Sequence, residues 1–187
     1  MFDRSSKQRT GRLVVRGAVC AAVLVLGVGG LAGTASAAET PPQGVDGNVA
    51  VGSSISLTGL TPSFTLTGLS GATVAGLDAV AYNVATNNLA GYAVTVQSQT
   101  ATMVADTAGN TDSIPIGALS ARDGAATGTF TYAPVAGPAA TDGTTVHTQP
   151  TRSAEGGDNL TTDFQVVIPF VNSDTYDATI DYVAATL

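Results

Sequence analysis

The sequence contains no tryptophan, one cysteine and one histidine, and its cations are unevenly placed. After residue 37 it has no cysteine and no lysine, and only Arg122 and Arg152 stand against thirteen acidic residues, which leaves a net charge of −11. The missing cysteines exclude disulfides and thiolate zinc sites there. The missing lysines exclude a Schiff base, a Walker phosphate loop and a Lys–Asn crosslink. So acidic a chain is not expected to bind nucleic acid through a basic surface.

Residues 1–37 are organised like an export signal. Five cations lie within residues 1–16, an apolar stretch covers residues 18–33, and Ala35-Ser36-Ala37 supplies the small-x-small pattern that signal peptidase reads. An uncleaved anchor is the alternative, but the stretch is short for the roughly 20 residues of a membrane span and contains several glycines. We predict cleavage after Ala37, a mature chain that begins at Ala38, and no membrane segment after cleavage.

The rest of the chain is predicted to be a flexible leader and one folded domain. Residues 38–48 contain Pro41-Pro42 and form the leader, and residues 49–187 have the size of one ordinary domain. No window keeps a 3.6-residue apolar period, whereas period-2 alternation recurs between Gly, Asn, Asp and Pro residues. This pattern predicts an all-β fold, an antiparallel β-sandwich with Greek-key-like connections.

Alternation is clearest in five runs. They are marked by Val80, Tyr82 and Val84; Tyr92, Val94 and Val96; Phe130 and Tyr132; Phe164, Val166, Ile168 and Phe170; and Tyr176, Ala178, Ile180, Tyr182 and Ala184. Weaker strands are predicted at residues 55–57, 64–66, 102–104, 114–116 and 145–147. Asn87-Asn88 predicts a hairpin loop between the first two runs, and Asn172-Ser173-Asp174 predicts the turn of a second hairpin between the last two. Pro169 predicts an edge position or a bulge.

Two of these segments resemble a known domain. They are Tyr82-Asn83-Val84 followed by Gly91-Tyr92-Ala93-Val94-Thr95-Val96, and Thr175-Tyr176-Asp177-Ala178-Thr179-Ile180-Asp181-Tyr182. Together they resemble the WxL-type surface domain of Gram-positive bacteria over residues 80–187, with Tyr92 and Tyr182 at the positions of the two family tryptophans. The resemblance implies a secreted β-sandwich held non-covalently on peptidoglycan, often beside other surface proteins. It also makes Tyr92 and Tyr182 candidate binding residues.

Acidic and amide side chains gather in loops. Asp106, Asn110 and Asp112 lie in one loop and supply the oxygen ligands that calcium prefers, so they are candidate calcium ligands. They do not match the twelve-residue calcium loop. Turn formation, in which Asp and Asn accept backbone N–H groups, explains the same residues. No other cofactor is predicted.

His147 is the one histidine from which a hydrolase site would be built. There is no Gly-x-Ser-x-Gly motif, and the neighbours Thr144, Thr145 and Thr148 predict an exposed strand. We therefore expect no enzymatic activity. The expected function is that of a secreted structural or adhesive protein of the bacterial cell envelope, which binds a wall polymer or other surface proteins. The alternatives are a subunit of an extracellular fibre or surface assembly, in which strands pair edge to edge, and a secreted carbohydrate-binding or hydrolytic protein.

Overall fold

The structure is a computed structural model that describes residues 39–126 and 131–187. In it, the segments with period-2 alternation form strands of antiparallel sheets. The predicted export signal and Phe130 lie outside the described residues. Residues 39–47 are exposed and carry no secondary structure. Asn48–Leu187 form one unit, which contains every assigned strand. Among the described residues, no helix has the length and apolar character needed to cross a membrane.

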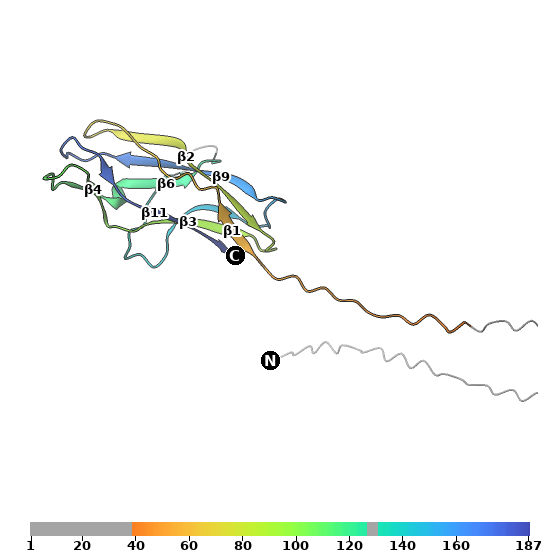
Figure 1. The fold of residues 1–187 in the computed structure, drawn as a ribbon. Helices are drawn as coiled ribbons and strands as arrows, with labels where there is room; N and C mark the ends of the chain where they lie inside the picture. The colour runs from red at the N-terminus through yellow and green to blue at the C-terminus, as the bar shows by residue number, and fades with distance from the viewer. Residues whose placement is uncertain (1–38, 127–130) are drawn as a thin grey trace, which may run out of the picture. The chain divides into compact units, whose positions relative to one another are not determined.

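The strands form two layers (Figure 1). One layer is a five-stranded sheet, ordered β1 (Ile55–Thr58), β2 (Thr73–Thr86), β9 (Asp158–Val167), β6 (Leu119–Asp123), β7 (Ala133–Pro134). The other layer consists of two three-stranded sheets. One is ordered β11 (Ile180–Thr186), β3 (Tyr92–Ser98), β8 (Thr144–Gln149), and the other is ordered β10 (Tyr176–Asp177), β4 (Thr102–Ala105), β5 (Ser113–Pro115). A short 3-10 helix, Ile116–Ala118, follows β5. The predicted all-β antiparallel sandwich is confirmed.

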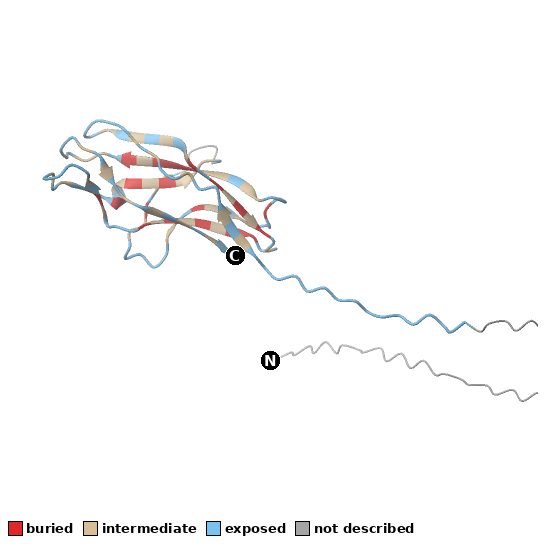
Figure 2. Cartoon of the chain, in the orientation of Figure 1, coloured by how far each residue is buried: buried red, intermediate tan, exposed pale blue. Residues whose placement is uncertain are grey.

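Buried residues lie on strands of both layers (Figure 2), and their side chains form one core. Tyr82 of β2 and Tyr182 of β11 approach across it, with ring centroids 5.3 Å apart. Each large aliphatic or Phe side chain buried in this way contributes about 1.5–3 kcal/mol. The buried apolar residues are Val80, Tyr82, Val84, Tyr92, Val94, Val96, Met103, Ile114, Ile116, Leu119, Ala121, Val135, Val146, Phe164 and Val166.

Two predicted hairpins are crossovers between the layers. Strands β2 and β3 lie in different sheets, so the loop with Asn87-Asn88 carries the chain from one layer to the other. The same holds for β9 and the C-terminal strands, which the turn at residues 172–174 connects. The hairpin predictions were wrong because alternation shows which face of a strand is buried, but not which strand it pairs with.

Two strand predictions also need correction, and one strand was not predicted. Residues 64–66 form no strand, although Phe64 stacks on Phe164 with ring centroids 4.4 Å apart. Strand β9 ends at Val167, so Pro169 lies beyond it, and Phe170 is 98% exposed instead of sharing the core face. Strand β6 was not predicted. Its inward positions are Leu119, Ala121 and Asp123, and because two of these side chains are small or charged, the alternation was too weak to predict a strand.

Candidate functional site

A β-bulge in β8 turns the only histidine inward. Thr145 pairs with Thr95 and His147 pairs with Val94, so Val146 is the extra residue of β8. Val146 is buried, and the His147 side chain is only 13% exposed. The exposed strand predicted around His147 is therefore wrong for this side chain, because the inserted residue changes the face to which the following residue points.

The inward imidazole meets a carboxylate from the opposite layer. His147 Nδ1 lies 2.7 Å from Oδ2 of Asp123 on β6, so the pair connects the two sheets. The Tyr92 ring lies against the imidazole, with centroids 5.7 Å apart. When the imidazole is neutral, Asp123 favours a proton on Nδ1 and leaves the lone pair on Nε2. Among the described residues, no side chain forms a hydrogen bond with Nε2.

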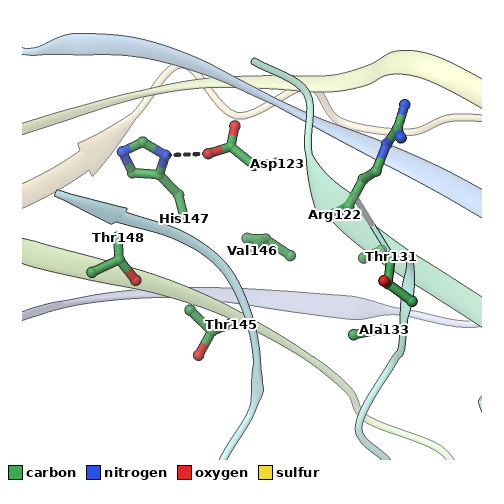
Figure 3. A pocket seen from close by; sticks show the side chains of 9 residues that line it. Arg122, Asp123, Thr131, Ala133, Thr145, Val146, His147 and Thr148 are labelled. Carbon is green, nitrogen blue, oxygen red and sulfur yellow. Dashed lines mark hydrogen bonds and ion pairs between the residues drawn. The ribbon is translucent and has the colours of Figure 1, made fainter. Parts of the chain in front are cut away.

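The pair borders a cavity of about 230 Å³ between β6 and β8. Figure 3 shows Asp123 turned toward His147 and Arg122 turned away from both. The lining residues are Ala121, Arg122, Asp123, Thr131, Ala133, Thr145, Val146, His147 and Thr148. Charged, imidazole and hydroxyl groups thus surround a small opening at the edge of the sandwich.

Arg122 is held beside this cavity by partners on the outer face of the five-stranded sheet. Its Nε donates to Asp163 Oδ2 at 2.9 Å, and its guanidinium lies 4.5 Å from the Tyr132 ring centroid. The bond to Asp163 raises the pKa of Arg122. Asp163 is buried and also accepts the backbone N–H of Asp78. The guanidinium charge is therefore largely neutralised within the protein.

Tyr92 and Tyr182, the candidate binding residues, belong to the core. Tyr92 has no exposed surface, and its hydroxyl donates to Asp158 Oδ2 at 2.7 Å. The Tyr182 ring faces Tyr82, and its hydroxyl oxygen is fully buried. The Tyr92 ring has no exposed face on which a sugar would stack, which contradicts its predicted binding role, whereas the partly buried Tyr182 stays a prediction.

Three buried hydroxyl groups have no hydrogen-bond partner among the described residues. They belong to Tyr82, Tyr182 and Thr162 of β9, and the Thr162 hydroxyl lies near both phenols. Burial raises the pKa of Tyr82 to about 12 and also raises the pKa of Tyr182. These polar atoms therefore weaken the core that the rings themselves stabilise.

The candidate calcium ligands do not converge on an ion site. Asn110 donates to Asp174 Oδ2 at 2.8 Å, and its own oxygen accepts the backbone N–H of Asp112. Asp112 Oδ2 accepts the backbone N–H of Asn172, whereas Asp106 is exposed. Among the described residues, no three His, Cys, Asp or Glu residues come together to hold a metal ion. The oxygens of Asn110 and Asp112 instead join the β4–β5 loop to the β9–β10 connection, as their turn-forming role suggests.

The comparisons with known proteins give no family: no protein family and no curated protein matches the chain. The site therefore has to be interpreted from its own chemistry. A serine-type hydrolase needs a hydroxyl or thiol bonded to the free ring nitrogen, and the described residues place none at Nε2. Sequence reasoning named His147 but missed Asp123. The inward parity of Leu119, Ala121 and Asp123 was the available signal.

Proposed function

We propose that the chain is a non-catalytic structural or adhesive β-sandwich of the bacterial cell envelope. It would be exported and would bind a wall polymer without covalent linkage. The observation that supports this proposal is the small polar cavity between β6 and β8, where Asp123, His147 and threonine side chains line one opening. Carboxylate, imidazole and hydroxyl groups are hydrogen-bonding partners for a polyhydroxylated sugar unit.

The size of the cavity favours an adhesive contact. Its 230 Å³ is below the roughly 300–1,000 Å³ of pockets that enclose a drug-sized ligand. It would receive one small polar group of a larger polymer, while the rest of that polymer stays in solvent. The hydrolytic alternative would need a nucleophile at His147 Nε2, which the described residues do not supply.

Charge determines how such binding would respond to salt. The chain after residue 37 carries −11, so it is repelled by anionic wall polymers at long range. Attraction must come from short-range contacts, and added salt screens the repulsion. Binding in this proposal therefore survives high salt or strengthens with it, unlike the binding of a basic wall protein.

The test is pelleting of the folded protein with purified Gram-positive wall sacculi at low and at high salt. We expect the protein in the pellet in both conditions, with at least as much at high salt. Protein that stays in the supernatant at both salt concentrations would remove the wall-binding proposal. N-terminal sequencing of the same protein tests the expected start at Ala38.

A further inference from the structure

One edge strand of the five-stranded sheet is short but carries no proline, charge or bulge. Edge strands normally carry a proline, a charge, a bulge or very few residues. The other edge strands of the described chain carry such features: Pro115 in β5, Pro134 in β7, the bulge in β8, Asp177 in β10 and Asp181 in β11. Strand β1 has the sequence Ile-Ser-Leu-Thr, with neither charge nor proline.

The strand pattern of β1 continues beyond its last partner. Ile55 and Leu57 are half-buried against the core, and Val49 and Val51 keep the same two-residue spacing. The ladder with β2 ends at Ile55, opposite Thr86. The Asn87 side chain adds one further step, because it donates to the Gly52 carbonyl and accepts the Ser54 N–H, both at 2.8 Å. Residues 48–52 therefore continue the two-residue apolar spacing of β1 without a strand assignment of their own, and they pair with no strand of the described residues.

This continuation exposes apolar surface. Val49 is 91% exposed and Val51 is 78% exposed. Along the chain, residues 47–77 contain no charged side chain, although the chain after residue 37 carries −11. Two copies of so acidic a protein repel each other over most of their surfaces. Residues 48–52 carry no charge of their own, so two copies can approach more closely there than along the acidic strands, although Arg152 and Glu155 border the same cavity as Ser54 and Ile55.

We propose that residues 48–52 pair antiparallel with the same segment of a second copy of this chain. A two-fold arrangement brings Val49 of each copy beside Val51 of the other, on one face of the new ladder. Two strands of this length bury less than the roughly 1,200–2,000 Å² of a stable interface, so the dimer is reversible and depends on concentration. The contact is distinct from the cavity at β6 and β8, so either proposal can fail without the other.

The first experiment is sedimentation velocity over a concentration series, on protein recovered from its host culture. We expect a dimer that grows with concentration and with added salt, because salt screens the repulsion between copies. The double variant Val49→Asp/Val51→Asp should stay monomeric. The control Leu89→Asp/Val104→Asp adds the same charge at side chains that are 85% and 56% exposed, and it should dimerise more than the Val49/Val51 variant. Unchanged melting temperatures show that both variants fold.

The second experiment detects the ladder directly by oxidation of single cysteine variants. Ala50→Cys should form a disulfide-linked dimer at least tenfold faster than Ala90→Cys, which lies at an equally exposed alanine outside the segment. A protein that is monomeric at every concentration, with equal crosslinking at both positions, overturns the proposal. Dimerisation that the Val49/Val51 variant retains and the control loses overturns it as well.

Discussion

At the scale of single residues, the core tyrosines differ in what their hydroxyl groups do. The Tyr92 hydroxyl donates to the Asp158 carboxylate, whereas the buried Tyr182 hydroxyl has no hydrogen-bond partner within residues 39–126 and 131–187. Replacing Tyr92 by Phe should lower the free energy of unfolding by about 1.5–3 kcal/mol, the range for a hydrogen bond to a charged group. Replacing Tyr182 by Phe should be neutral or stabilising, because it removes an unpaired buried polar atom.

Urea unfolding of the two Phe variants measures this difference. Each variant is the control for the other, since both remove one oxygen from a core ring and leave the packing in place. Equal destabilisation by the two substitutions would show that the Tyr182 hydroxyl is hydrogen-bonded in solution, and would contradict this description of the core.

Burial of these phenols also predicts how the fold responds to alkali. Burial raises the pKa of Tyr82 from 10.0 to about 12, and the pKa of Tyr92 is raised by burial and by its bond to Asp158. A raised pKa contributes stability below the unfolded value near 10 that is lost as the pH rises toward 12. Tyrosinate absorbance and circular dichroism should therefore change together in that window. Ionisation of all five tyrosines near pH 10 with the fold intact would contradict the assignment.

At the scale of elements, the loop network around Asp174 connects the β4–β5 loop to the β9–β10 connection. The bond from Asn110, followed by those from Thr107, lowers the pKa of Asp174. A lowered pKa contributes stability above the unfolded value of about 3.8 that disappears as the pH falls through the folded value. Asp174→Ala should therefore lower the melting temperature at neutral pH and have less effect in acid.

Asp106→Ala is the matched control for this loop network, because Asp106 is exposed and its carboxylate makes no hydrogen bond among the described residues. It should leave the melting temperature unchanged at both pH values. Calcium or a chelator should shift neither variant nor the parent protein, since the Asp112 and Asp174 carboxylates already accept N–H and O–H groups. Stabilisation by calcium at micromolar concentrations would restore the calcium prediction.

How much of the fold the sequence predicts depends on the strand. Large apolar residues in alternation predict the second half of β2, most of β3 and most of β11, because bulky side chains hold most of the inward positions there. Strand β6 is not predicted, because two of its inward positions are held by Ala121 and Asp123, which are not large apolar residues. The inward turn of His147 depends on one inserted residue opposite Thr95, which a single sequence does not reveal. Pairing across layers is likewise set by the whole core and not by local alternation.

At the scale of the whole molecule, the distribution of charge links the two proposals. Acidic residues lie before residue 47 and after residue 77, and the stretch between them contains β1 and the first part of β2. Long-range repulsion limits contact with anionic polymers and with other copies alike. The two proposals therefore place contacts where short-range chemistry is available, at the cavity between β6 and β8 and at the continuation of β1.

The central claim, that the cavity at Asp123 and His147 is the adhesive contact, is tested most directly by pelleting with wall sacculi. Asp123→Asn keeps the shape of the side chain but removes the charge beside the imidazole, and Asp106→Asn makes the same change on an exposed loop. We expect Asp123→Asn to reduce the bound fraction at least fivefold, while Asp106→Asn binds like the parent protein, and circular dichroism should show both variants folded at the assay temperature. Equal binding by the parent and by both variants would contradict the claim.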